Sequence, residues 1–435
     1  MSHANPVSVF TGHLPGTREY RRLLAGLFFA GVATFAQLYA PQAVLPQIAA
    51  EADVSAATAA LTVSAATLGL AAAVIPWSMV ADRICRVPAM VIGISAATAL
   101  GVAAPFSPDI TVLLLVRLLE GIALGAVPAI ALAYLSEEVD VRHAAAAAGS
   151  YIAGTTVGGL SGRIVAGPIG DVVDWRTGVW ATAALCAVAA VLFVWLVPRA
   201  RGFAPGRSRK PGARALGGTQ SRGPASEPPG VASAGAPGIL VRLWAAFRAP
   251  GQLALYAQGF LLMGAFVAVY NYLGFQLSAP PFSLSHTVVT LLFLAYLAGT
   301  VSSPWAGALA TRHGRLPVLL AGIGVMAAGT ALMLVPWAPA VLVGLVIMTA
   351  GFFAAHAIAS GWAPARADPI TRAQTSSLYY LGYYGGSSLF GWCLGLVFAA
   401  LGWAGLVVGV LIMCAVAASS ALLSLRAGGT TDAAR

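Results

Sequence analysis

The stretch VADRICRVPA, residues 80–89, holds one acid and two arginines between two long apolar runs, and a shifted copy, LATRHGRLPV, occurs at residues 309–318. Charged residues make up only 9% of the chain, whereas a soluble domain carries about 25%. A charged segment that recurs at the same place in both halves of an apolar chain indicates an internal repeat. We predict that each copy is a short loop between two membrane-spanning helices.

Apolar runs long enough to span a bilayer, about 20 residues each, fill most of the 435-residue chain. Twelve are predicted, near residues 23–46, 57–80, 88–105, 110–134, 145–168, 177–197, 252–276, 286–310, 316–335, 340–362, 374–398 and 404–425. The sequence therefore predicts an all-α integral membrane protein with twelve transmembrane helices in two six-helix pseudo-repeats.

The segment between the sixth and seventh runs is rich in Gly, Pro, Ser and Arg and has no hydrophobic period, so we expect a flexible linker there. The expected divisions are an N-terminal segment, a six-helix bundle, a basic linker, a second six-helix bundle and a tail, at residues 1–22, 23–198, 199–251, 252–426 and 427–435.

Basic residues set the expected orientation, since cytoplasmic loops carry an excess of Lys and Arg. With a cytoplasmic N-terminus, 21 of the 24 basic residues fall in cytoplasmic segments and only Arg176 falls in an outer loop. Both termini and the linker are therefore expected in the cytoplasm. The net charge of +10 does not indicate nucleic-acid binding, because the basic residues are spread over short connectors. The four cysteines form no CxxC pair, so no metal site is expected.

The two charged loops resemble the pattern G-x-L-A-D-R-x-G-R-[RK] of the cytoplasmic 2–3 loop in the major facilitator superfamily. The first copy keeps the acid, Asp82, without either glycine, and the second keeps both glycines with Thr311 in place of the acid. In the fourth run, Arg117-Leu-Leu-Glu120-Gly121 resembles the R-x-x-Q-G of that family. The chain thus resembles this superfamily over essentially its whole length, and within it bacterial inner-membrane efflux permeases of the drug and arabinose type.

The resemblance implies the major facilitator fold and a secondary transporter that works by alternating access, with the proton gradient and no cofactor as its energy source. Its expected partners are a small-molecule substrate, protons and the lipid of the bacterial inner membrane, with no nucleic acid, and we expect a monomer. Export of a drug, sugar or metabolite by proton antiport is the first hypothesis, and proton-coupled uptake of a metabolite is the alternative. A polytopic receptor or membrane enzyme is disfavoured, because the sequence has no P-loop, H-E-x-x-H or other enzyme motif.

The antiporter signature of the fifth helix is only half matched, which leaves the direction of transport open. Gly154, Gly158 and Gly162 have the required spacing, but Gly167-Pro168 arrives one residue late. We interpret the three glycines as a close-packing seam, and the resemblance implies that this helix lies against run 286–310 of the other half.

Ionisable residues inside a membrane are candidate functional residues, because burying charge there is unfavourable. Arg117 and Glu120 are three residues apart, share one helix face and are expected to pair. Movement that separates the pair would let Glu120 take up a proton; the alternative is a static ion pair that fixes packing. His356 is a second candidate for proton coupling or a packing residue. Arg163 either orients an anionic substrate or reaches the outer interface, where Asp171 or Asp174 would pair with it.

Polar and aromatic side chains in the spans are expected to face a cavity or another helix. The resemblance places the first and fourth helices of each half around a central cavity. Candidate substrate contacts are Gln37, Tyr39, Gln42, Arg163, Tyr270, Asn271, Tyr272, Tyr379, Tyr380 and Tyr383. Interhelical hydrogen bonding is the alternative for these groups, and the glycines at 382, 386, 391 and 395 predict a packing seam.

The charged loops are expected to act as a conformational latch. In this hypothesis Asp82 accepts from the N-terminus of the eleventh helix, and Arg86 reaches Glu137, Glu138 or Asp140. The candidate latch residues are Asp82, Arg83, Arg86, Glu137, Arg312 and Arg315. Because the second copy lacks the acid, its electrostatic role is expected to differ.

Overall fold

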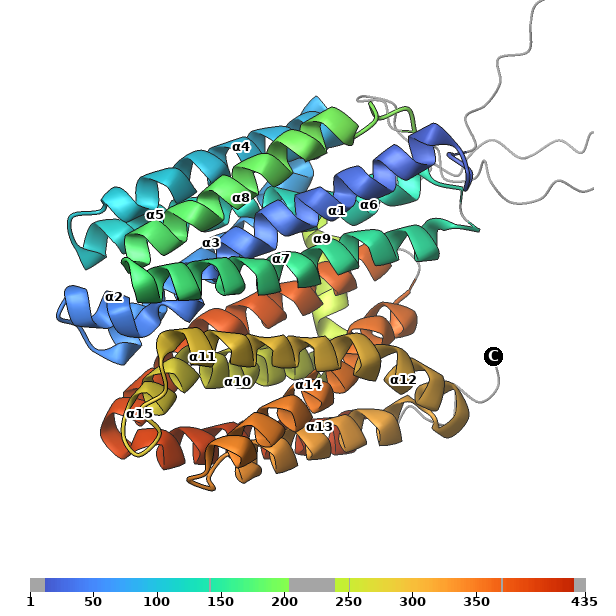
Figure 1. Ribbon diagram of the computed structural model, residues 1–435. Coiled ribbons are helices and arrows are strands. Elements are labelled where there is room, and N and C mark those ends of the chain that lie inside the picture. Colours follow the sequence, from blue (N-terminus) through green and yellow to red (C-terminus); the bar gives the residue numbers. More distant parts are fainter. Residues whose placement is uncertain (1–11, 141, 203–238, 250, 369–370, 426–435) are drawn as a thin grey trace, which may run out of the picture.

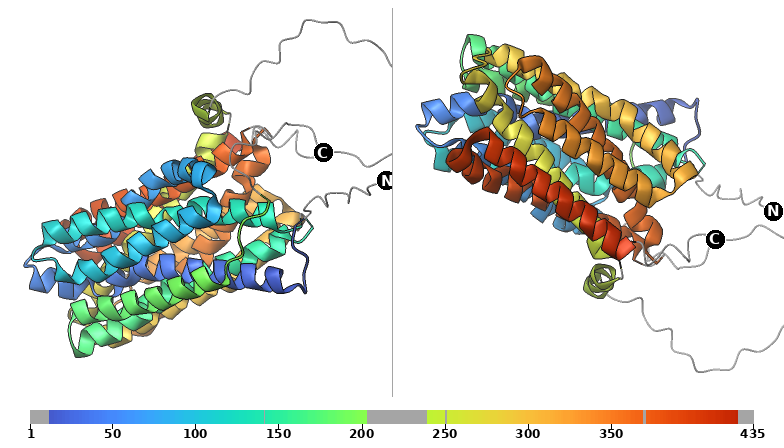
Figure 2. Two further views of the ribbon diagram at one scale, coloured as in Figure 1. Left: turned by 90° about the horizontal axis from the view of Figure 1, so that it is seen from above. Right: turned by 90° about the horizontal axis from the view of Figure 1, so that it is seen from below.

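The computed structural model describes residues 12–140, 142–202, 239–249, 251–368 and 371–425. The first half consists of α1 (Arg18–Tyr39), η1 (Ala40–Ala43), α2 (Leu45–Glu51), α3 (Ala56–Ile84), α4 (Arg86–Ala103), η2 (Ala104–Phe106), α5 (Ile110–Leu124), α6 (Ala126–Glu138), α7 (Ala144–Val172) and α8 (Trp175–Leu196). The second half consists of α10 (Gln252–Ser278), α11 (His286–Leu291), η3 (Leu292–Tyr296), α12 (Leu297–His313), α13 (Arg315–Leu332), α14 (Ala338–Arg366) and α15 (Arg372–Leu425). The halves form two bundles side by side, with long helices running in roughly the same direction (Figures 1 and 2).

Each of the twelve predicted apolar runs falls on helix. By length and composition, ten helices among the described residues qualify as membrane spans. The tenth is a 52-residue stretch of α15 that is interrupted at Gly402, where φ is 66°. A Cβ at Gly409 would lie against the Leu394 side chain, so the two arms of α15 pack on each other as a helical hairpin. The remaining predicted run is α7, 29 residues long.

Five helices of the described chain begin at a polar residue whose side chain caps the helix N-terminus. Side chains of Thr17, Ser55, Asp109, Asp174 and Ser285 each accept a hydrogen bond from the backbone N–H three residues on. Such caps satisfy one of the donors that a helix N-terminus leaves open, and each contributes about 1 kcal/mol. The polar residue between two apolar runs therefore fixes where each of these helices begins.

The two charged loops have the same backbone shape, which confirms the internal repeat. Cys85 joins α3 to α4 with φ 75° and ψ 159°, and Gly314 joins α12 to α13 with φ 85° and ψ 160°. Glycine adopts this region readily, whereas a residue with a Cβ is strained there. Both loops lie at the end of the molecule where α1 begins and α8 ends, which we name the turn end (Figure 1).

The glycine seam of α7 packs against α1. A Cβ at Gly154, Gly158 or Gly162 would collide with the backbone of Phe28, Val32 or Ala36, respectively. The expected contact of this helix with run 286–310 is confirmed, but it is made by the C-terminal half of α7, where Arg163 contacts Tyr296, Gly167 contacts Thr290 and Asp171 contacts Thr287. In α15 the expected packing is confirmed, since Gly382 and Gly386 lie against α10, and Gly391 and Gly395 reach α3 of the other half.

Among the described residues, the hydrogen bonds between the halves lie away from the turn end. There the Asp171 carboxylate accepts from the backbone N–H and hydroxyl of Thr287, at 3.1 and 2.7 Å. Farther in, the Ser388 hydroxyl donates to the Ser64 carbonyl at 2.7 Å. These bonds join α7 to α11 and α15 to α3, so this end of the interface is closed.

One helix, α9 (Ile239–Arg248), lies in the segment expected to be a flexible linker. Its sequence, ILVRLWAAFR, places apolar residues at helical spacing with two arginines among them. Val241, Trp244 and Phe247 are exposed, as on a helix that lies along a membrane surface. The linker prediction rested on composition and overlooked this short amphipathic period; residues 203–238 lie outside the described part of the chain.

Candidate functional site

Arg117 and Glu120 form a buried ion pair inside the first half. Arg117 is 2% exposed and Glu120 is fully buried, and the Arg117 Nη1 donates to Glu120 Oε2. The Arg117 Nε also donates to the Thr62 carbonyl at 3.0 Å. The predicted pairing on one face of α5 is therefore confirmed.

Arg117 also caps the broken end of α1. Because Pro41 has no N–H, the carbonyl of Gln37 loses its helical partner, and Arg117 Nη1 donates to it at 3.3 Å. The Nη2 donates to the Leu38 carbonyl at 2.8 Å. The guanidinium thus links α5 to the point where α1 ends and η1 begins.

The Glu120 carboxylate is incompletely satisfied. Its Oε1 is buried beside the Gln37 amide and accepts no hydrogen bond of normal geometry from the described residues. Gln37 instead donates its amide to the Ala97 carbonyl of α4. A buried carboxylate oxygen without a donor is unfavourable while charged, and protonation would relieve that cost.

Arg163 lies at the interface between the halves. It is fully buried, and its Nε and Nη2 donate to Gln42 Oε1 at 2.8 and 2.6 Å. The Nη1 donates to the Gly159 carbonyl at 2.5 Å, and the Nη2 to the Tyr296 hydroxyl at 3.1 Å. Gln42 in turn donates to Asn271 Oδ1 at 2.6 Å. One chain of hydrogen bonds therefore joins α7, η1, α10 and η3.

Aromatic rings surround this guanidinium and continue into the second half. The Arg163 Cζ lies 4.6 Å from the ring centroids of Tyr39 and Tyr296 and 4.9 Å from that of Phe293, which is cation–π geometry. We give the name aromatic cluster to the following of these rings: Tyr39, Phe266, Tyr270, Phe293, Tyr296, Phe352, Phe353, His356, Tyr379, Tyr380 and Tyr383. It extends from buried Arg163 to Tyr380, which is 37% exposed.

His356 belongs to this cluster and not to the ion pair. Its Nδ1 lies 2.9 Å from the Tyr379 hydroxyl, and its ring centroid is 4.8 Å from that of Tyr383. Glu120 has its partners on α5 and α1. The two groups predicted to couple protons, the Glu120 carboxylate and the His356 imidazole, therefore lie in different halves.

Other predicted cavity residues make helix-to-helix bonds. The Tyr272 hydroxyl donates to the Gly391 carbonyl at 2.8 Å, and the Tyr270 hydroxyl lies 2.8 Å from Thr349 Oγ1. Asn271 accepts from Gln42 and lies between the halves. Gln37, Tyr270 and Tyr272 thus bond between helices of their own half. Gln42, Arg163 and Asn271 bond across the interface between the halves, where Tyr39 also lies.

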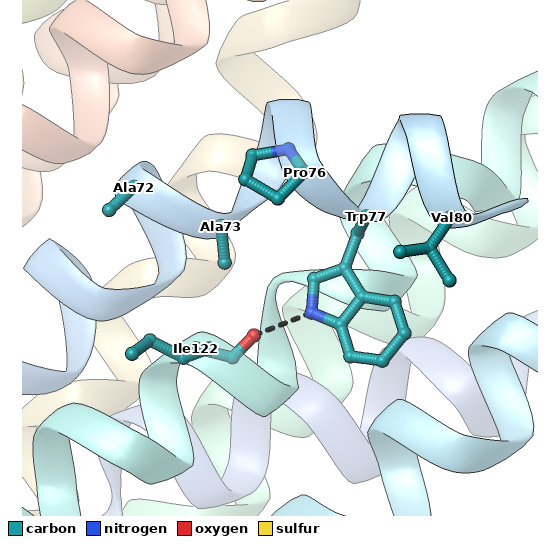
Figure 3. A pocket seen from close by; sticks show the side chains of 6 residues that line it. All are labelled: Ala72, Ala73, Pro76, Trp77, Val80 and Ile122. Carbon is teal, nitrogen blue, oxygen red and sulfur yellow. Dashed lines mark hydrogen bonds between the residues drawn. The ribbon is translucent and has the colours of Figure 1, made fainter.

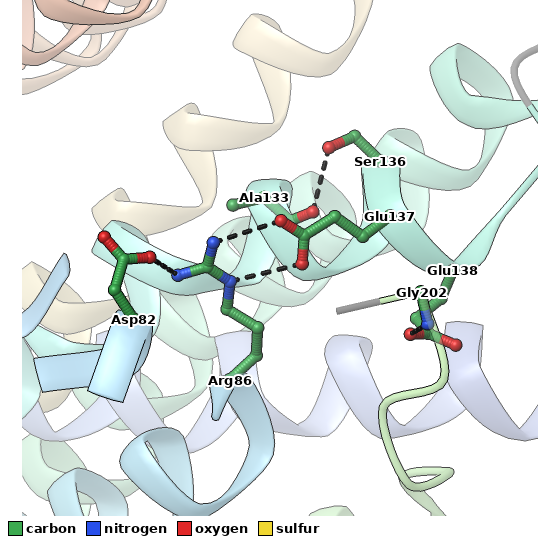
Figure 4. A network of polar contacts seen from close by, with 7 residues as sticks. All are labelled: Asp82, Arg86, Ala133, Ser136, Glu137, Glu138 and Gly202. Carbon is green, nitrogen blue, oxygen red and sulfur yellow. Dashed lines mark hydrogen bonds and ion pairs between the residues drawn. The ribbon is translucent and has the colours of Figure 1, made fainter. Parts of the chain in front are cut away.

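At the turn end, Arg86 is the centre of a charge network (Figure 4). Its Nη1 donates to Asp82 at 2.7 Å, and its Nε and Nη2 donate to Glu137 at 3.2 and 3.0 Å. Asp82 is directed to Arg86, with its side chain 59% exposed, and not to the start of α15 as the latch hypothesis required. Asp140 pairs with Arg142, whose hydrogen bonds hold the pKa of that carboxyl below its ordinary value.

The other arginines considered as latch residues form no ion pair with the described residues. Arg83, Arg312 and Arg315 are exposed, so among the described residues the charge network belongs to the first loop, which carries the acid Asp82. Glu138, considered as an alternative partner for Arg86, accepts instead from the backbone N–H groups of Arg201 and Gly202 at 2.6 Å each.

Sequence reasoning missed two features. Tyr296 contacts Arg163 directly. In the sequence, the one indication of this role was that Tyr296 is a polar aromatic residue within an apolar run. A hollow of about 310 Å³ lies beside Pro76 and is lined by α3 and Ile122. Figure 3 shows the Trp77 indole donating to the Ile122 carbonyl at 2.7 Å, close to the break at Gly125 that separates α5 from α6. Pro76 in the second apolar run and Gly125 in the fourth were the available signals in the sequence.

Known proteins share this organisation of helices. Residues 27–284 match the family model described as Major Facilitator Superfamily. The chain belongs to the Major Facilitator Superfamily. It is therefore a membrane transporter with an all-helical fold, as the sequence predicted.

Two curated members of the superfamily are similar over nearly the whole chain. The "Inner membrane transport protein YnfM" of Escherichia coli is 35% identical over 402 residues, 92% of this chain and 90% of that protein. The "Uncharacterized MFS-type transporter YybF" of Bacillus subtilis is 31% identical over 404 residues, 92% of this chain and 93% of that protein.

Solved superfamily structures share the fold. A bacterial homologue of the human lysosomal transporter Spinster, inward-facing and unoccupied, has a TM-score of 0.71 at 16% identity, covering 95% of this chain and 98% of that one. A point mutant of the nucleoside transporter NupG has a TM-score of 0.68 at 16% identity, covering 93% of this chain and 99% of that one. At this identity the likeness concerns the fold alone.

Proposed function

We propose that this protein exports a small organic molecule across the bacterial inner membrane by proton antiport with alternating access. The observation that supports the proposal most is the buried Arg117–Glu120 pair, in which one carboxylate oxygen lacks a normal hydrogen bond. Protonating Glu120 would release Arg117, and Arg117 also holds the end of α1. A proton can thus be coupled to movement of the helix that carries Tyr39 and Gln42.

The proposed orientation places the turn end, both termini and the linker in the cytoplasm, since the basic residues gather on that side. The hydrogen bonds between the halves lie toward the opposite end, so in this orientation the periplasmic side of the interface is closed. We propose that the network around Arg86 favours one of the two states by holding α3, α4 and α6 together. A single chain contains both halves of the site, and a monomer is the proposed working unit.

Proton-coupled uptake is the second candidate, because the half-matched antiporter signature at Gly167-Pro168 does not set the direction. The two are separated in proteoliposomes by reversing the pH gradient. An acidic interior drives accumulation by an antiporter, and an acidic exterior drives accumulation by a symporter. Ethidium, L-arabinose and 2-naphthalenesulfonate provide a cation, a sugar and an anion as probes.

The proton role of Glu120 is tested by comparing two kinds of flux. We expect Glu120→Gln to retain exchange of a transported probe without a gradient and to lose accumulation driven by the gradient. Glu51→Gln is the matched control, since Glu51 pairs with Arg176 at the end away from the turn end and its side chain is half-exposed. Accumulation by Glu120→Gln at the wild-type level would remove Glu120 from the mechanism.

A further inference from the structure

Arg163 is a buried charge that has no counterion among the described residues. Arg86, Arg117 and Arg163 are the buried arginines of the described chain. Arg86 has carboxylates of Asp82 and Glu137 at 2.7 and 3.0 Å, and Arg117 has that of Glu120. Within the part of the chain that the structure describes, no carboxylate lies within 4.0 Å of Arg163.

The acids that were expected to pair with Arg163 are used elsewhere. Asp171 accepts from Thr287 across the interface, and Asp174 accepts from the N–H of Thr177 as the cap of α8. The cation is instead solvated by neutral groups, namely Gln42, the Gly159 carbonyl and Tyr296. Neutral oxygens replace only part of the hydration that a charge loses on burial, so the site retains a strong preference for an anion.

The surroundings fit an anion attached to a flat apolar body. Guanidinium presents five N–H donors in a planar fork that suits a carboxylate, and Gln42 Oε1 occupies two of them like one oxygen of such a group. The rings of Tyr39, Phe293 and Tyr296 lie around the fork. From there the aromatic cluster leads toward exposed Tyr380.

We propose that Arg163 and Gln42 form the anion-binding subsite of this transporter, and that its substrate is an aromatic or similarly flat molecule bearing a carboxylate or equivalent anion. The proposal rests on the transport function proposed above. It adds a substrate class that neither the family nor the fold assigns.

The geometry also connects binding to the closed end of the interface. An anion that takes the fork displaces Gln42 Oε1, and Gln42 is the residue that donates to Asn271 of the other half at 2.6 Å. Freeing Gln42 therefore weakens one of the hydrogen bonds between the halves, which include the Asp171–Thr287 contact. Substrate binding would in this way promote opening of the end away from the turn end.

The test compares charged and neutral twins of one probe at equilibrium. Binding of benzoate and benzamide, and of 2-naphthoate and 2-naphthamide, is measured on purified full-length protein by intrinsic fluorescence. We expect the wild type to bind each carboxylate about 30-fold or more tightly than its amide, the effect of truncating one partner of a buried charge pair. Arg163→Gln is expected to lose that preference and still bind the amides.

Two further variants keep the result decisive. Arg176→Gln removes a partly exposed arginine at the start of α8 that pairs with Glu51, outside the aromatic cluster, and is expected to keep the wild-type preference. Arg163→Lys keeps the charge without the fork and is expected to retain a reduced preference, which also serves if Arg163→Gln does not fold. A merely structural Arg163 would change the stability of the unliganded protein and leave the acid-to-amide ratio intact.

The proposal is overturned if the wild type binds acid and amide equally, if it binds no carboxylate of the series, or if Arg163→Gln keeps the preference. Its failure is separate from failure of the transport proposal. Gradient-driven accumulation of ethidium or L-arabinose without carboxylate preference would refute the anion subsite alone, whereas carboxylate preference without any gradient-driven flux would refute antiport alone.

Discussion

Replacing Cys85 by glycine is expected to stabilise the protein, because Cys85 has a backbone conformation that suits only glycine. Its φ of 75° and ψ of 159° nearly equal those of Gly314 in the second half, 85° and 160°. A Cβ in this region costs about 1–3 kcal/mol. Introducing glycine lowers the free energy of unfolding by about 0.5–1 kcal/mol, because the unfolded chain gains conformational freedom. Cys85→Gly should therefore gain about 1 kcal/mol.

Thermal unfolding in detergent by intrinsic fluorescence, at one scan rate, measures this gain. About 1 kcal/mol raises the midpoint by roughly 2–4 °C for a domain of 150–250 residues. Cys85→Ala is the matched control, since it removes the thiol and keeps the strained Cβ, and it should unfold near the wild type. If Cys85→Gly unfolds no higher than Cys85→Ala, the strain argument is wrong.

Three other outcomes follow from packing and topology. Gly162→Ala forces a Cβ into the backbone of α1 and should destabilise the protein by about 1–3 kcal/mol in the same thermal assay. Gly149→Ala is the control, because its Cβ meets open space; its stability should be unchanged or rise by up to about 1 kcal/mol. Equal unfolding midpoints for the two variants would contradict the packing of α7 on α1. Deleting residues 205–235 should leave flux in proteoliposomes intact, and loss of folded protein in detergent would show that they are more than a linker. A C-terminal fluorescent protein fusion should fluoresce and a C-terminal alkaline phosphatase fusion should be inactive, the reverse pattern placing the C-terminus outside.

Local chemistry made much of the fold predictable. Apolar runs of bilayer length located the helices, Ser55 and Asp109 marked where two of them begin, and the repeated charged loop revealed the two halves. These signals depend on neighbours in sequence. The helix α9 was missed because a ten-residue amphipathic period inside a Gly- and Pro-rich segment is outweighed by its surroundings.

Contacts between distant segments were predicted less well. Arg117 and Glu120 are three residues apart on one helix, so their pairing follows from helical geometry. Gln42 and Arg163 are 121 residues apart, and their pairing depends on the rotation of two helices about their axes. The same rotations direct the α7 glycines to α1 and the Tyr272 hydroxyl to Gly391, which spacing alone does not determine.

Movement of protons against substrate is the central claim, and internal pH measures it directly. Proteoliposomes containing the protein and pyranine are prepared without a gradient, and ethidium, L-arabinose and 2-naphthalenesulfonate are added outside in turn. We predict that at least one of them raises the internal pH as it enters, because each substrate molecule exchanges for a proton, and that Glu120→Gln abolishes the rise while Glu51→Gln preserves it. A fall in internal pH would show symport, and entry without any change in pH would contradict proton coupling.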